Sequence, residues 1–234
     1  MEVDILENRF HLSYDVKSEL AKGESGFNKM KLLFVDCIQK ICPEFIIDDT
    51  NRENISKIFN WTIRNKNGAL DPQKGLWICG NIGTGKSTIM KAIIKFINQN
   101  WRVDYDEKIN QRWENVSDYC GKYCLDGYSA FNSLPMGFDE FGTEICPSNH
   151  LGNKINVMAH TINVIHDTLW ESRPHIITTN CSMKSILESY GPRVVDRIGH
   201  IFNIVIFKGG TRRSSSKVWD IINEEEKADK SRLP

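Results

Sequence analysis

The eight residues 80–87, GNIGTGKS, constrain the fold of this chain more than any other segment. A short apolar run, residues 76–79, precedes them, and residues 87–98 follow with apolar side chains at helical spacing. Glycines permit left-handed backbone angles and let several N–H groups gather at the first turn of a helix, where the helix dipole adds positive potential. We therefore predict a buried strand, an anion-binding loop and a helix, in that order.

The spacing of these residues fully matches the pattern G-x-x-x-x-G-K-[ST]. In this pattern the lysine, here Lys86, contacts the β- and γ-phosphates of a nucleotide, and the hydroxyl of Ser87 binds Mg²⁺. A chance match in a glycine-rich turn is the alternative, but the strand before the loop and the helix after it favour a nucleotide site. ATP and Mg²⁺ are the expected ligands. The expected binding residues are Gly80, Asn81, Ile82, Gly83, Thr84, Gly85, Lys86 and Ser87.

Two carboxylates, Asp139 and Glu140, end an apolar run that begins at Met136. At the end of a strand, Asp139 would hold Mg²⁺ and Glu140 would polarise the attacking water as a general base. An acidic pair at a helix N-terminus is the alternative, and Pro135 and Gly137 make the strand a weak one. Because a P-loop is present, we favour the metal ligand and the base.

Residues 176–180, IITTN, form a buried strand that runs into short polar side chains. Asn180 could reach the γ-phosphate or the attacking water from a neighbouring strand. Thr-Asn also commonly closes a strand and begins a turn, so this segment alone leaves both interpretations open.

These segments together resemble the AAA+ ATPases, in particular the DnaC-like helicase loaders and the IstB-like transposition ATPases. The resemblance covers residues 45–213, and its specific pieces are KGLWICGNIGTGKST, FDEFGTE, LGNKINVM, HIITTN and YGPRVVDRIGHIFNIVIFKGGTRR. It implies that residues 80–88, with Thr88 included, are the Walker A loop. It also implies that Asp139 and Glu140 are the Walker B pair and that Asn180 is a sensor.

The same resemblance implies that Arg197 is an arginine finger presented to the nucleotide of a neighbouring subunit, and that Arg212 or Arg213 is a second sensor near the phosphates. A finger in trans requires a nucleotide-dependent homo-oligomer. From the residues alone, Arg197 is an ordinary helical arginine of the kind that makes a weak surface ion pair. The basic cluster near the end of the chain, which holds Arg212 and Arg213, is equally consistent with a solvated face.

Strands alternating with helices after residue 75 predict an α/β fold with a parallel sheet flanked by helices, and the resemblance implies a P-loop sheet of the AAA+ type. Further strands are expected at 136–138, 175–178 and 202–207, and further helices at 154–170 and 183–190. We predict a helical N-terminal region over 1–70, with a helix at 29–41 and another capped by Thr50 or Asn51. The ATPase domain is expected over 71–213 and a polar tail over 214–234.

Bulk composition excludes some classes of protein. Lys plus Arg and Asp plus Glu are both 30, so overall charge gives no argument for nucleic-acid binding. No signal peptide or membrane span is evident, and seven irregularly spaced cysteines indicate reduced thiols in a cytosolic protein. The aromatic side chains between the two Walker motifs could stack on bases, but core packing is favoured for most of them. They are Trp101, Trp113, Tyr119 and Tyr123.

Four functions remain open. The favoured one is an ATP-driven loader that binds single-stranded DNA and delivers a replicative helicase, with the N-terminal region as the partner-binding part. The alternatives are an IstB-like ATPase that assists a transposase on duplex DNA, a nucleotide-gated adaptor that barely hydrolyses ATP, and a small-molecule kinase. The kinase is disfavoured because Asp139-Glu140 and a polar sensor strand suit attack by water better than transfer to a bound acceptor.

Overall fold

A parallel five-stranded sheet forms the centre of the computed structural model, which describes residues 3–104, 106–169 and 173–212. The strand order across the sheet is β10-β2-β9-β6-β5, and every neighbouring pair is parallel. The strands are rich in β-branched and aromatic residues, which suit a sheet buried on both faces. Their bounds are β2 Gly75–Gly80, β5 Trp113–Asn115, β6 Gly137–Phe141, β9 Ile176–Thr179 and β10 Phe202–Phe207.

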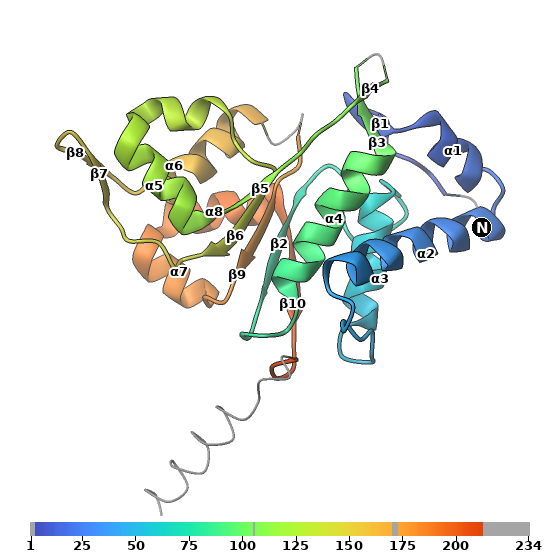
Figure 1. Cartoon of the computed structure of the whole chain (residues 1–234). Coiled ribbons are helices and arrows are strands. Elements are labelled where there is room, and N and C mark those ends of the chain that lie inside the picture. Colours follow the sequence, from blue (N-terminus) through green and yellow to red (C-terminus); the bar gives the residue numbers. More distant parts are fainter. Residues whose placement is uncertain (1–2, 105, 170–172, 213–234) are drawn as a thin grey trace, which may run out of the picture.

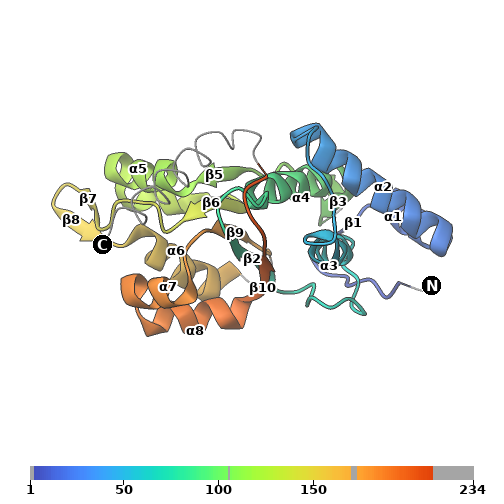
Figure 2. The same cartoon turned by 90° about the horizontal axis from the view of Figure 1, so that it is seen from below.

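Helices cover both faces of the sheet, as Figures 1 and 2 show. One face carries α2 (Glu24–Ile41), α3 (Arg52–Thr62) and α4 (Lys86–Asn100). The opposite face carries α5 (Val116–Asp126), α6 (Val157–Val164), α7 (Met183–Tyr190) and α8 (Pro192–Ile201). Two separate hydrophobic clusters, one on each face, hold these three layers together. The predicted α/β architecture is thereby confirmed.

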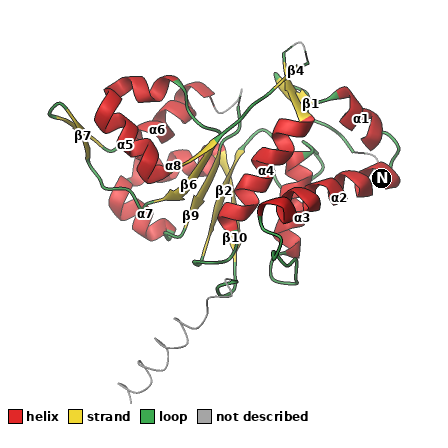
Figure 3. Cartoon of the chain, viewed as in Figure 1, coloured by secondary structure: helices red, strands yellow, loops and turns green. Residues whose placement is uncertain are grey.

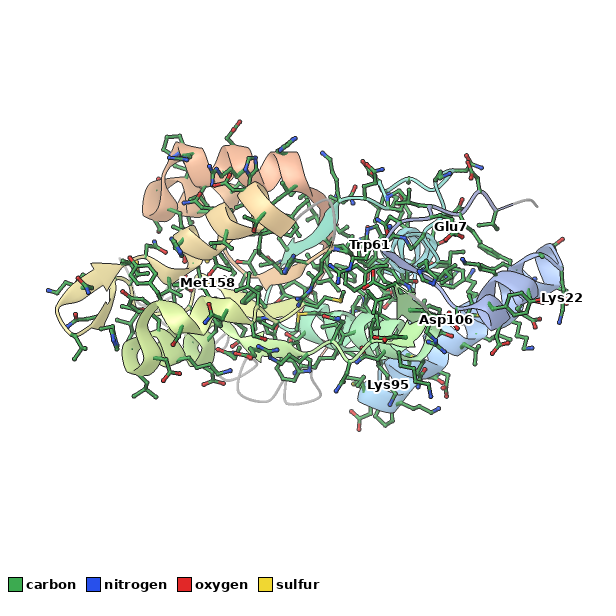
Figure 4. All side chains as sticks on the ribbon, turned by 90° about the horizontal axis from the view of Figure 1, so that it is seen from above. Glu7, Lys22, Trp61, Lys95, Asp106 and Met158 are labelled. Carbon is green, nitrogen blue, oxygen red and sulfur yellow. The ribbon has the colours of Figure 1, made fainter. Side chains whose placement is uncertain are left out.

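The N-terminal residues pack into the same core as the P-loop helix. Phe34 of α2 contacts Phe59 of α3 and Phe96 of α4, with ring centroids 5.9 and 5.6 Å away. Trp61 likewise packs against Trp101, and Figure 4 shows Trp61 inside this half of the molecule. The N-terminal region, with α2 and α3, is therefore part of the same packed core as the sheet. Its role as a partner-binding region stays a prediction.

Short elements complete the fold, and Figure 3 shows how they lie at its two ends. Near the N-terminal side, β1 (Phe10–Leu12), β3 (Trp101–Val103) and β4 (Glu107–Lys108) form an antiparallel sheet beside α1 (Tyr14–Leu20). At the other end, β7 (Ser148–His150) and β8 (Asn153–Ile155) form a hairpin next to α5, and η1 (Gly127–Asn132) is a 3₁₀ helix. No helix among the described residues is long and apolar enough to cross a membrane.

Three local predictions need correction. The helix expected at 154–170 begins only at Val157, because Asn156 caps it by accepting a hydrogen bond from Ala159 N and β8 occupies the residues before it. A π-helix, η2 (Ile165–Leu169), continues it, and Trp170 lies outside the described residues.

Asn51 stands at the N-cap position of α3 but makes no capping hydrogen bond with its side chain. Its amide instead donates to Ile46 O and accepts from Asp48 N. Gly137, expected to weaken a strand at 136–138, is the first residue of β6, which continues to Phe141. A Cβ there would come within 2.6 Å of Ile94 Cδ1, so glycine allows α4 to pack closely on the sheet.

Candidate nucleotide-binding site

The predicted anion loop lies between the end of β2 and the start of α4. Its glycines are required at two points. Gly80 has φ 142° and lies so close to β10 that a Cβ would come within 2.0 Å of Phe207 O. Gly85 caps α4 with φ 93°, and a Cβ there would approach the Phe45 ring to 2.5 Å. The loop therefore has the left-handed turns and the tight packing that direct the first N–H groups of α4 toward an anion.

Lys86 is buried and its ammonium donates a hydrogen bond to Asn81 O at 2.7 Å. The Thr84 hydroxyl donates to the same carbonyl at 2.9 Å. The loop is thus folded back on itself around the lysine head group. A phosphate bound here would compete with Asn81 O for the ammonium, which is the interaction expected of a P-loop lysine.

Asp139 is the middle residue of β6 and does not end the strand as predicted, because β6 continues to Phe141. Its side chain contacts Ser87 in the first turn of α4. Its Oδ1 accepts hydrogen bonds from Ser87 Oγ at 2.7 Å and from Thr178 Oγ1 at 2.5 Å. A serine hydroxyl and a carboxylate side by side are hard oxygen donors of the type that Mg²⁺ prefers. These two residues, brought together from 52 positions apart, fit the predicted metal site.

Glu140 follows Asp139 in a strained conformation, with φ 66°, where β6 shifts its register against β9. Its Oε2 accepts a hydrogen bond from Asn115 Nδ2 at 2.8 Å, and its backbone N–H donates to Thr178 Oγ1 at 3.1 Å. Sequence reasoning missed Asn115 and the role of Thr178. The one sequence signal that could have drawn attention to Asn115 is its type, since asparagine is a common helix N-cap. Its Oδ1 does cap α5, by accepting a hydrogen bond from Ser117 N.

A cavity of about 700 Å³ opens beside the loop and brings most of the predicted residues together. It is lined by Cys42, Glu44, Phe45, Ile46, Asp48, Ile82, Gly83, Gly85, Lys86, Ser87, Thr88, Glu140, Thr178, Thr179, Asn180 and Arg212. Of the other predicted loop residues, Gly80, Asn81 and Thr84 shape the turn without lining the cavity. Asn180 is exposed at the end of β9, between the P-loop strand and the strand of Asp139.

Arg212 lies on the cavity wall and binds the N-terminal layer. Its guanidinium forms a bidentate pair with Asp48, at 2.7 and 2.9 Å, and its backbone N–H donates to Gly83 O at 2.9 Å. The Arg212 guanidinium, with help from Thr50, holds the pKa of the Asp48 carboxyl well below its usual range. Arg212 thus connects residues 46–50 to the P-loop. Arg213 lies outside the described residues.

Arg197 lies apart from the cavity, on α8, with 9% of its side chain exposed. Its guanidinium donates to Asn163 Oδ1 at 2.6 Å and pairs with Asp167 at 3.1 Å. The finger role stays a prediction, and to reach a neighbouring subunit this side chain would have to leave Asp167.

Comparison with solved structures identifies the fold class. The structure of a DnaC helicase loader is similar over 72% of this chain and 96% of its own, with a TM-score of 0.51 and 18% identity. A primosome component from Streptococcus pyogenes matches with a TM-score of 0.50 and 15% identity, over 72% of this chain and 85% of its own. AMPPCP-bound DnaA from Aquifex aeolicus matches 81% of this chain at a TM-score of 0.51 and 14% identity, and this chain spans 55% of that one.

No family model and no curated protein matches the sequence. The strand order and the P-loop, together with these structures, show that the chain has the fold of the AAA+ P-loop ATPases. Within that class, its fold is of the kind found in DnaC and DnaA, which confirms the fold that the resemblance implies.

Proposed function

We propose that the protein is a Mg²⁺-dependent ATPase of DNA replication, of the helicase-loader kind, which works in the cytoplasm. The observation that carries the proposal is the contact between Ser87 and Asp139, 2.7 Å apart, with Glu140 on the wall of the adjoining cavity. Metal ligands and a carboxylate base beside a P-loop are the parts that hydrolysis of a nucleoside triphosphate needs.

Each side chain has a defined task in this proposal. Lys86 and the N–H groups of the first turn of α4 hold the phosphates. Ser87 and Asp139 hold Mg²⁺, which when bound neutralises charge on the phosphate oxygens. Glu140 accepts a proton from water at its carboxylate, and Asn180 orients that water or the terminal phosphate.

The loader is favoured because the structure of a DnaC helicase loader is similar over 96% of its own chain and 72% of this one. We infer single-stranded DNA and a replicative helicase as partners, and a homo-oligomer in which Arg197 reaches a neighbouring nucleotide. An ATPase that assists a transposase on duplex DNA is the second candidate, since the sequence resembles those proteins over the same residues. Both candidates use the same cavity, so only the partners separate them.

The decisive experiment is steady-state ATP hydrolysis, alone and with single-stranded or duplex DNA, for the wild type, Glu140→Gln and Lys86→Ala. Glu140→Gln should bind ATP and lose about 10²–10⁴-fold in turnover, the usual contribution of a general base. Lys86→Ala should lose ATP binding itself. Unchanged ATP affinity in Lys86→Ala would exclude the P-loop site.

The DNA dependence separates the candidates. Stimulation by single strands that disappears in Glu140→Gln supports the loader, and a helicase should then copurify with the protein. Stimulation by duplex alone favours the transposase helper. Tight ATP binding with no turnover under any condition would exclude the ATPase and leave a nucleotide-gated adaptor.

A further inference from the structure

Lys91 lies one turn beyond the P-loop on α4 and faces two groups at once. Its ammonium is 3.8 Å from Asp139 Oδ2 and 3.9 Å from the centroid of the Trp113 ring. The side chain of Asp139 is 7% exposed and that of Lys91 is 28% exposed. A charged group that sequence analysis passed over therefore lies beside the predicted metal ligand.

The two oxygens of Asp139 have different surroundings. Oδ1 accepts from the hydroxyls of Ser87 and Thr178, whereas Oδ2 faces Lys91. A nearly buried carboxylate is costly without a nearby positive charge, so Lys91 stabilises Asp139 in this state. The 3.8 Å separation is longer than a close ion-pair hydrogen bond, which leaves the ammonium room to move.

Trp113 contacts the same ammonium in the same position. It lies on β5 and is 40% exposed, unlike the buried Trp101, Tyr119 and Tyr123. The face of an indole ring attracts a cation, most strongly where water is partly excluded. Lys91 can therefore withdraw from Asp139 along the ring without losing all of its favourable contacts.

We propose that Lys91 is an internal counter-cation of Asp139 that competes with Mg²⁺, and that its ammonium moves away from Asp139 along the Trp113 ring when the metal binds. Lys91 thereby sets the Mg²⁺ concentration at which the site fills. This inference rests on the proposed function, because it takes Ser87 and Asp139 as the metal ligands. Lys91 is a positioning residue here, since it acts on the metal through Asp139.

The test measures metal binding and not turnover. Mn²⁺ is titrated into the protein saturated with the non-hydrolysable analogue AMPPCP, and free Mn²⁺ is followed by electron paramagnetic resonance. Lys91→Met removes the charge and keeps the length of the side chain, so the Kd for Mn²⁺ should fall about tenfold as repulsion between two nearby cations is relieved. Lys91→Arg keeps the charge and should retain the wild-type Kd within about twofold.

The matched control is Lys95→Met, one turn further along α4 and toward α2 (Figure 4). It removes the same net charge at a greater distance from Asp139 and should leave the Kd within about twofold of wild type. Equal shifts in Lys91→Met and Lys95→Met would overturn the inference, because only general electrostatics would then be at work.

Fluorescence supplies a second readout. The metal-dependent signal of Trp113, taken as the difference between wild type and Trp113→Phe, should change on titration with Mg²⁺ and AMPPCP and should disappear in Lys91→Met. A signal that persists in Lys91→Met would contradict movement of the ammonium over the ring. If the wild type binds no AMPPCP at saturating metal, the proposed function itself fails. If the wild type binds AMPPCP and Lys91→Met leaves the Kd for Mn²⁺ unchanged, only the role of Lys91 is overturned.

Discussion

The amide of Asn115, the last residue of β5, donates a hydrogen bond to Glu140 Oε2 across 2.8 Å. The two strands are neighbours, and Asn115 pairs in register with Asp139. Because Glu140 adopts φ 66°, its carboxylate turns toward Asn115 while the residue still lines the nucleotide cavity. The predicted catalytic base is therefore restrained by a residue of the adjacent strand.

Asn115→Ala should raise ATP turnover several-fold in the absence of DNA. The hydrogen bond holds the Glu140 carboxylate toward β5, so removal of the amide leaves the carboxylate free to turn toward the attacking water. Asn115 also caps α5, and its loss as a cap should cost about 1 kcal/mol of stability. Asn115→Ser retains a capping side chain and separates the two effects. Lower turnover in both variants would show instead that the hydrogen bond positions Glu140 productively, and unchanged turnover would show that it does not restrain the base.

Arg212→Ala and Asp48→Asn should each weaken nucleotide binding several-fold. The bidentate pair holds residues 46–50 against the P-loop, and Ile46 and Asp48 of this segment line the cavity. Fluorescent ATP titrations would measure the effect. Asp49, whose exposed side chain pairs with Arg52 at 3.4 Å, provides the matched control, and Asp49→Asn should not alter affinity. If Arg212→Ala binds ATP normally, the pair has no role in shaping the cavity.

Arg197→Ala should leave ATP binding intact and reduce turnover only where the protein is concentrated enough to assemble. The same loss of turnover in dilute monomer would exclude a finger in trans. Because the change also removes the partner of Asn163 and Asp167, some stability is lost, and Arg197→Lys keeps a cation there as a second variant. Turnover measured against protein concentration, alongside light scattering, checks this prediction.

His175 should make the fold sensitive to acid. Burial, with a further contribution from the charge of Arg173, lowers the pKa of His175 to about 3, and neither ring nitrogen has a hydrogen-bond partner among the described residues. The unfolded chain therefore takes up this proton first. The free energy of unfolding is unaffected by His175 above pH ~6.5 and should fall by up to ~1.4 kcal/mol per pH unit below that, toward pH ~3.

Urea titrations between pH 7.5 and 4.5 would measure this dependence. His175→Leu should flatten it, whereas a substitution at His160, whose pKa is lowered by only partial burial, should change it less. A pH profile of His175→Leu that matches the wild type would assign the acid sensitivity to other groups.

Elements defined by local pattern could be predicted from the sequence. The strand at 202–207 and the helix at 183–190 match β10 and α7 residue for residue. The three-residue strand β5 could not be predicted, because it is a strand only by pairing with β6. The same holds for β1 and β3, which join residues far apart in the chain.

Some residues of the candidate site could also be predicted from the sequence, and others could not. The loop motif and the acidic pair were found because their types and spacing carry the chemistry, and Asn180 because it follows a strand. Asn115, Thr178 and Lys91 are ordinary polar residues in the sequence. Their contacts depend on which strands are neighbours, and that information arises only when β5, β6 and β9 align.

The packing of α2 and α3 on α4 also determines which truncated forms of the protein can be used in experiments. A shortened chain beginning at residue 71 would contain every Walker residue, but it would expose the side of α4 that Phe34 and Phe59 cover. Each such buried aromatic contributes about 1.5–3 kcal/mol, so the fragment would be prone to aggregate. Contacts made by the first seventy residues are therefore better mapped with single surface substitutions in the whole chain than with deletions.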